Sequence, residues 1–121
     1  MRFELSQKFY FDAAHTLQRA IESEGSKRIH GHTYSVEVTV AGEQHADTGM
    51  VIDLGLLREE ISVVREMLDH HLLDEVPGIG VPTLENLCAF IAQRLNIERS
   101  LLQSVKVWRD GVGDSCTLRF N

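Results

Sequence analysis

Three histidines on two nearby segments could bind one metal ion. His15 stands alone, whereas His30 and His32 flank Gly31. Side chains two residues apart on a strand lie on the same face, so both imidazoles of the pair can reach a single ion. Three neutral imidazoles leave one position of a zinc ion open for water or substrate, whereas structural zinc sites usually close all four positions with protein ligands. The spacing predicts a catalytic zinc site, and the alternative is three hydrogen-bonded histidines near a sheet surface.

The segments that carry these histidines have the two-residue periodicity of strands. Residues 2–14 alternate between apolar and polar side chains, and residues 28–41 contain a run rich in β-branched side chains. His15 follows the first strand directly, so antiparallel pairing of the two would bring it beside the other histidines. Residues 16–27 are polar and irregular, and we expect a loop that borders the metal.

Two helices and two further strands are expected downstream. Apolar residues recur at three- and four-residue steps in two segments, which Asp53 and Thr83 can cap at their N-termini. The expected helices cover 54–68 and 84–95, and the expected strands cover 104–109 and 117–120. The order ββααββ predicts one α+β domain over 1–121, an antiparallel sheet with two helices on one face. The other face and the sheet edges would stay open, so we expect self-association.

Composition and charge narrow the class of protein. The 121 residues are 43% hydrophobic and 25% charged, typical of one globular domain. A net charge of −6 argues against a nucleic-acid or anionic-membrane partner. Cys88 and Cys116 lie far apart, and we expect both to be small buried side chains. The chain starts without an apolar signal segment, and we expect a cytoplasmic protein.

Five segments together resemble the 6-pyruvoyltetrahydropterin synthase and 6-carboxytetrahydropterin synthase family. They are Phe11-Asp12-Ala13-Ala14-His15, His30-Gly31-His32-Thr33-Tyr34, Thr48-Gly49-Met50-Val51-Ile52-Asp53, Leu68-Asp69-His70-His71-Leu72 and Pro82-Thr83-Leu84-Glu85-Asn86. The resemblance implies a tunnelling fold whose ββααββ subunits form a ring, a homohexamer built as a dimer of trimers, with active sites between subunits. It also implies Zn²⁺ on His15, His30 and His32.

The resemblance further implies a reaction. Family enzymes act on 7,8-dihydroneopterin triphosphate, and the metal polarises side-chain oxygens for carbon–oxygen or carbon–carbon cleavage. The leading hypothesis is a zinc-dependent lyase similar to 6-carboxytetrahydropterin synthase, in queuosine precursor synthesis, with a phosphorylated pterin as substrate. Two alternatives remain: a zinc enzyme of this fold with a non-pterin or acidic substrate, and a catalytically silent oligomer that binds metal and ligand.

An adjacent carboxylate and imidazole could transfer protons. Asp69 can fix the tautomer of His70, which then takes or gives a proton near neutral pH. The match to the family places a catalytic role on this pair. The alternative is a polar helix end, in which the histidines favour the C-terminal helix dipole.

The chain departs from the family pattern at a catalytic position. The family usually has a cysteine four residues before the first histidine of the His-Gly-His element, where this chain has Ser26. A serine hydroxyl is a weak acid–base partner unless a base activates it. Glu22 or Glu24 in the same loop could replace the thiol, with Glu24 the closer candidate, and a solvated acidic loop is the alternative.

A second departure affects substrate recognition. Arg109 stands at or beside the place of the family's pterin-anchoring glutamate. A guanidinium only donates hydrogen bonds, so it cannot accept from the pterin amino edge but could meet a carboxylate or phosphate. Asp110 could accept, but one step along a strand reverses the side-chain direction. Thr83 and Glu85 are further substrate-binding candidates, although an acidic residue in a first helical turn also stabilises the helix.

Overall fold

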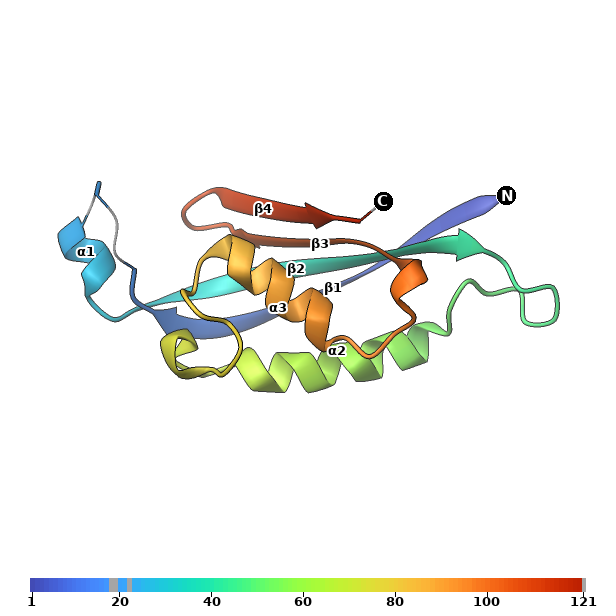
Figure 1. Ribbon diagram of the computed structural model, residues 1–121, viewed down its shortest axis with the longest axis horizontal. Coiled ribbons are helices and arrows are strands. Elements are labelled where there is room, and N and C mark those ends of the chain that lie inside the picture. The colour runs from blue at the N-terminus through green and yellow to red at the C-terminus, as the bar shows by residue number, and fades with distance from the viewer. Residues whose placement is uncertain (18–19, 22, 121) are drawn as a thin grey trace.

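A four-stranded antiparallel sheet with helices on one face forms the protein, in a computed structural model that describes residues 1–17, 20–21 and 23–120 (Figure 1). The strands are β1 (Arg2–His15), β2 (His30–Glu43), β3 (Leu102–Arg109) and β4 (Asp114–Arg119), in that spatial order. The helices are α1 (Ser23–Lys27), α2 (Leu54–Leu68) and α3 (Leu84–Arg94), with 3₁₀ turns η1 (Leu73–Glu75) and η2 (Arg99–Leu101). The predicted α+β class is therefore confirmed.

The two longest strands pair along their whole length. In the register of β1 and β2, His15 lies opposite His30, and Ala13 lies opposite His32. Because side chains alternate across a strand, all three histidines share the face that also buries Phe11. The predicted pairing of the histidine segments is confirmed.

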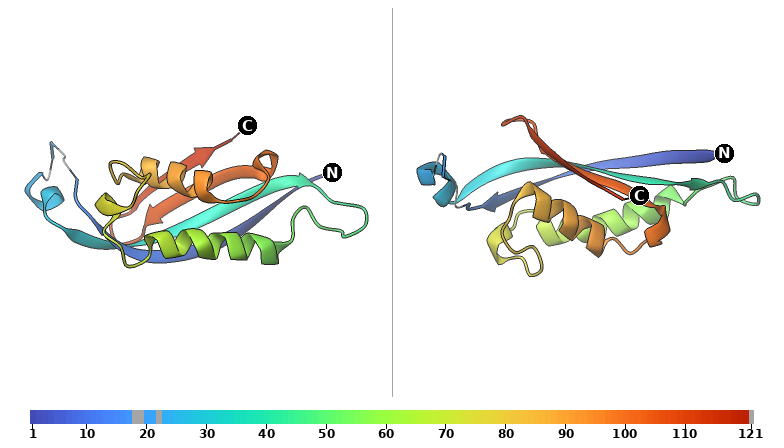
Figure 2. Two further views of the ribbon diagram at one scale, coloured as in Figure 1. Left: turned by 60° about the horizontal axis from the view of Figure 1, so that its bottom comes forward. Right: turned by 45° about the horizontal axis from the view of Figure 1, so that its top comes forward.

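Helices α2 and α3 cover the inner face of the sheet (Figure 2). Helix α2 packs on β1, and α3 packs on β3 and β4. Each helix begins where the sequence predicts: the Asp53 side chain accepts from the Gly55 N–H, and the Thr83 side chain accepts from the Asn86 N–H. These caps satisfy N–H groups that have no partner inside the helix.

The core lies between the helices and the inner face of the sheet. The aromatic rings of Phe11 and Tyr34 stack with centroids 5.0 Å apart, and both side chains are fully buried. Cys88 is buried, as predicted, whereas Cys116 is only half-buried because it lies on the edge strand β4. Burial raises the pKa of the Cys88 thiol to about 12, which keeps it protonated. None of the described helices is both long and apolar enough to cross a bilayer.

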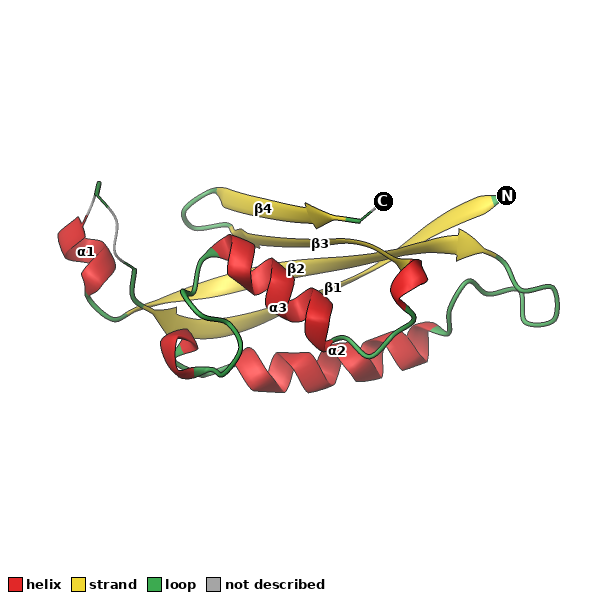
Figure 3. Cartoon of the chain, in the orientation of Figure 1, coloured by secondary structure: helices red, strands yellow, loops and turns green. Residues whose placement is uncertain are grey.

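Short helical segments lie in the expected loop 16–27 and in the connection between α2 and α3 (Figure 3). The segment before β2 contains α1, where Glu24 in the first turn and Lys27 in the last complement the helix dipole. The connection between α2 and α3 contains η1, whose Leu73 is fully buried. Of the two segments, η1 places a polar side chain beside the end of β1, because Asp74 accepts from Thr16.

Candidate metal centre and its cavity

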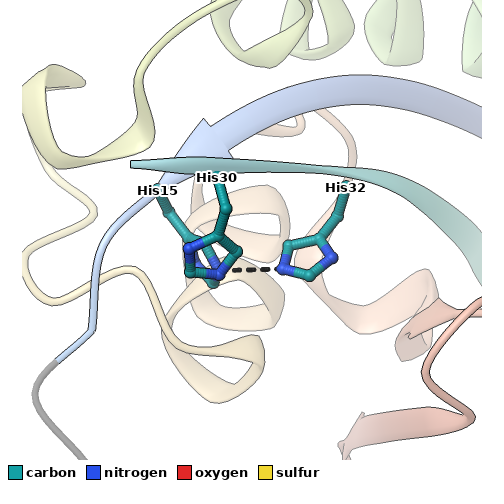
Figure 4. A group of neighbouring side chains, drawn as sticks. All are labelled: His15, His30 and His32. Atoms are coloured by element: carbon teal, nitrogen blue, oxygen red, sulfur yellow. Dashed lines mark hydrogen bonds between the residues drawn. The ribbon is translucent and has the colours of Figure 1, made fainter. Parts of the chain in front are cut away.

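Three histidine side chains converge at the ends of β1 and β2 (Figure 4). The Nε2 atom of His15 lies 3.0 Å from Nε2 of His30 and 3.1 Å from Nε2 of His32. Zinc–nitrogen bonds of about 2.0–2.1 Å in a tetrahedral arrangement place ligand nitrogens about 3.3 Å apart. The observed separations therefore match a set of ligands around one small cation.

The hydrogen bonds of the other ring nitrogens fix the tautomers of two of these histidines. His15 Nδ1 lies 3.1 Å from the carbonyl oxygen of Pro82, and His30 Nδ1 lies 2.7 Å from that of Arg28. A carbonyl oxygen only accepts, so each Nδ1 carries the hydrogen and each neutral ring directs a lone pair from Nε2. Two lone pairs 3.0 Å apart repel unless a cation lies between them. The donor set fits a divalent metal.

The environment of His15 favours the neutral, metal-binding form of its ring. Its side chain is buried, and this burial lowers the pKa of the imidazole, against a smaller opposite effect of the hydrogen bond to Pro82. The hydroxyl group of Tyr34 lies 3.4 Å from Nδ1. Burial also raises the pKa of Tyr34 to about 12, so that the phenol stays neutral.

An aspartate holds the chain directly after His15. The two carboxylate oxygens of Asp74 in η1 accept from Thr16, at 2.9 Å from its backbone nitrogen and 2.6 Å from its hydroxyl. Burial, the largest single influence, would raise the pKa of Asp74, but the two bonds from Thr16, the residue's own backbone N–H and the charge of His15 together lower the pKa. Sequence analysis did not identify Asp74, because no local pattern connects it with Thr16.

A cavity of about 890 Å³ opens beside His15, one of the three converging histidines. His15 and Tyr34 line one side, and Thr83 and Glu85 at the start of α3 line another. The two predicted substrate-binding residues of α3 therefore lie on the same cavity as the buried histidine. The Thr83 hydroxyl is engaged as the N-cap, whereas the Glu85 side chain is exposed.

The same cavity contains an ion pair from the end of the sheet, between a buried arginine and a half-exposed aspartate. Arg109, at the end of β3, is only 8% exposed, and its Nη2 lies 2.7 Å from Oδ2 of Asp114 on β4. Its Nη1 lies 3.4 Å from Nε2 of His32. Asp110 is exposed in the turn that follows and does not line the cavity. Sequence analysis missed Asp114, whose proximity follows from the β3–β4 register.

Asp69 and His70 form a pair just after α2. The Nδ1 of His70 lies 2.9 Å from Oδ2 of Asp69, while Oδ1 of Asp69 accepts from the backbone N–H of Asp12 at 2.9 Å. That backbone bond, followed by the contact with His70, lowers the pKa of Asp69. His70 has a φ of 60°, which non-glycine residues rarely adopt, and its N–H donates to the Asp12 carbonyl oxygen.

Within one chain, His70 does not line the cavity beside His15. It borders a separate depression of about 530 Å³, together with His32 and Asp12. Two separate cavities therefore border the ends of β1 and β2. One is lined by Arg109, and the other is lined by His70.

The third group of predicted catalytic residues lies on or before α1. Glu24 is exposed in the first turn of this helix. Glu22 lies outside the described residues, and the same holds for the side chain of Ser26.

Comparison with known proteins identifies the family. The model of the 6-pyruvoyl tetrahydropterin synthase family matches residues 4–119. The chain therefore belongs to this family. Its relatives are enzymes of pterin metabolism.

Individual relatives agree with this assignment. The chain is 35% identical to the dihydroneopterin monophosphate aldolase of Pyrococcus furiosus over 109 residues, which are 90% of this chain and 87% of that protein. It is 35% identical to the 6-carboxy-5,6,7,8-tetrahydropterin synthase of Synechocystis over 95 residues, which are 74% of this chain and 71% of that protein. The structure of Caenorhabditis elegans 6-pyruvoyl tetrahydropterin synthase superposes with a TM-score of 0.83 at 26% identity, covering 100% of this chain and 97% of that one.

Proposed function

We propose that the protein is a zinc-dependent lyase that cleaves the side chain of a phosphorylated dihydropterin. One observation carries the proposal: in a chain of the pterin synthase family, His15, His30 and His32 direct three ring nitrogens toward one point. Bound zinc would supply Lewis-acid polarisation of substrate side-chain oxygens. The leading reaction is that of 6-carboxytetrahydropterin synthase on 7,8-dihydroneopterin triphosphate.

A second candidate reaction is supported by the relative from Pyrococcus furiosus. That protein is named an aldolase of dihydroneopterin monophosphate, and the match spans 87% of its length. This chain also has Ser26 where the family usually has a cysteine. Aldol cleavage of dihydroneopterin monophosphate would give 6-hydroxymethyl-7,8-dihydropterin and glycolaldehyde phosphate. The two reactions share the metal and the proton-transfer residues and differ in the bond broken.

Asp69 and His70 are the proposed proton-transfer pair. The carboxylate holds Nδ1 of the imidazole at 2.9 Å, which leaves Nε2 to take a proton from the substrate or return one. The lowered pKa of Asp69 keeps the carboxylate ionised, and an ionised neighbour stabilises the imidazolium that forms. Glu24 on α1 is the proposed second acid–base group, in the place of the missing thiol.

The active site is proposed to form between subunits of a ring, as the family resemblance implies. Support comes from the two separate hollows, because the metal-side cavity and the His70 depression share no lining residue. A neighbouring copy would bring its own His70 to the cavity. We expect a homohexamer, checked by analytical ultracentrifugation.

Recognition of the substrate is assigned to the walls of the cavity. Arg109 has donors only, so the carboxylate of Asp114 is the proposed acceptor for the amino and N–H edge of the pterin. Thr83 and Glu85 line the cavity on the side of α3.

The products of two substrates test the proposal. Zinc-loaded protein is incubated separately with dihydroneopterin triphosphate and dihydroneopterin monophosphate. Acetaldehyde with carboxytetrahydropterin supports the leading reaction, and glycolaldehyde phosphate supports the aldolase. His70→Ala should abolish either reaction and keep the metal, with His71→Ala as the exposed neighbouring control.

Two further outcomes decide the alternatives. No turnover of either substrate, in protein that holds one zinc per chain, would rule out the pterin lyase and favour a different substrate or a silent binding protein. Mixing inactive His32→Ala with inactive His70→Ala subunits should restore part of the activity if one site draws on two chains.

A further inference from the structure

Arg109 places a fixed positive charge beside the proposed metal ligands. Its Nη1 lies 3.4 Å from the Nε2 atom of His32, the atom that would bind the ion. Its side chain is nearly enclosed, and Nε is buried with no hydrogen-bond partner among the described residues. A guanidinium stays protonated at any physiological pH. A divalent ion on the histidines would therefore lie close to a second cation that cannot lose its charge.

Three carboxylates among the described residues line the same cavity as Arg109. Asp114 pairs with Arg109 at 2.7 Å and removes one positive charge from the cavity. Asp74 also lines the cavity; both of its oxygens accept from Thr16, and these bonds hold its negative charge at the end of β1. Glu85 lies on the rim with an exposed side chain. These carboxylates lower the net charge of the cavity, but none of them separates the Arg109 guanidinium from Nε2 of His32, because those two groups are in direct contact at 3.4 Å.

We propose that Arg109 couples metal binding to the binding of an oxyanion in this cavity. The anion, a carboxylate or a phosphate-like group, accepts from the guanidinium and offsets the repulsion between the arginine and the metal. Because such coupling is reciprocal, the anion tightens metal binding as much as the metal tightens anion binding. The inference rests on the proposed metal site and deepens it: the ligand that this site takes presents an anionic oxygen to Arg109.

The coupling can be tested by comparing the zinc affinity of the protein in different salts, which requires no catalytic turnover. A chromophoric chelator competes for zinc in sodium chloride, sodium sulfate or sodium formate at one ionic strength and neutral pH. Sulfate represents a tetrahedral oxyanion and formate a planar one, so the two arms distinguish a phosphate-like from a carboxylate ligand. We expect at least one of them to tighten zinc binding by about fivefold or more, the lower end of typical coupling.

Two variants should change zinc affinity in opposite directions. Arg109→Met removes the repelling charge, so zinc in chloride should bind roughly tenfold more tightly and the oxyanion effect should vanish. Asp114→Asn removes the compensating charge, so zinc in chloride should bind more weakly and the oxyanion effect should grow. Damage to the fold would weaken binding in both variants. Arg119→Met, which removes an exposed arginine from the same hairpin, is the matched control and should leave both quantities unchanged.

The possible failures are distinguishable. Equal zinc affinity in all three salts, or an oxyanion effect that survives in Arg109→Met, would overturn the coupling and leave the zinc lyase in place. No zinc binding by the wild-type protein in any salt would overturn both. Should Arg109→Met fail to fold, Asp114→Asn decides: an unchanged or smaller oxyanion effect in that variant contradicts the proposal.

Discussion

The Nδ1 atom of His15 donates a hydrogen bond to the carbonyl oxygen of Pro82, 3.1 Å away and 67 residues later in the chain. Pro82 directly precedes Thr83, which caps α3, so the start of this helix fixes the orientation of a proposed metal ligand. Partners of this kind set the tautomer and direction of metal-binding histidines, and their loss typically lowers metal affinity.

Removing the cap of α3 should therefore lower both the zinc affinity and the stability of the folded chain. Thr83→Ala loses the bond from the Asn86 N–H, and we expect the free energy of unfolding to fall by about 1 kcal/mol. Zinc affinity should fall by roughly tenfold as Pro82 loosens. Asp53→Ala is the matched control, since it removes the cap of α2 at a similar cost in stability and should leave zinc affinity unchanged. Equal weakening of zinc binding in both variants would contradict this coupling.

Loss of one ligand should abolish tight metal binding without unfolding the chain. His32→Ala removes one of three nitrogens, so zinc affinity should fall by more than about 100-fold, beyond the loss typical of outer-sphere partners. The far-ultraviolet circular dichroism spectrum should not change, because His32 is only half-buried at a strand end. The exposed His45→Ala serves as the control in the same chelator competition.

Replacing His70 by glycine should separate stability from activity. His70 has a φ of 60°, which costs a non-glycine residue about 1 kcal/mol, and its contact with Asp69 is exposed. His70→Gly should therefore unfold at the same or a higher denaturant concentration, while turnover falls by about 100-fold or more. A clear loss of stability with activity retained would show that His70 serves the fold rather than the reaction.

The buried phenol of Tyr34 should make the protein sensitive to alkali. Its pKa is about 12 in the folded chain against about 10 when unfolded, so only the unfolded chain loses this proton between those values. Unfolding is therefore favoured as the pH rises from about 10 to 12, and the folded state loses roughly 2 to 3 kcal/mol. Tyr34→Phe should lack this loss, measured by chemical denaturation at a series of pH values. Parallel curves for the two proteins would contradict the shift.

The main strands, the two long helices and the shared face of the histidines could be predicted because they depend on local patterns. Alternation along β1 and β2 follows from strand geometry, and it puts His30 and His32 on one face in any register. The caps at Asp53 and Thr83 involve backbone N–H groups only two or three residues away. Contacts between residues so close in the sequence can be predicted without knowing the tertiary structure.

The sequence by itself therefore determined the α+β order, the helix starts and the three histidines of the candidate metal centre. Only the tertiary structure decided what surrounds them: Asp74 on Thr16, Pro82 on His15, and Arg109 with Asp114 beside His32. Three of these contacts join residues between 58 and 77 positions apart. They form because η1, α3 and β3 pack against the ends of β1 and β2. The periodicity of a single strand or helix does not predict how that element packs against the others.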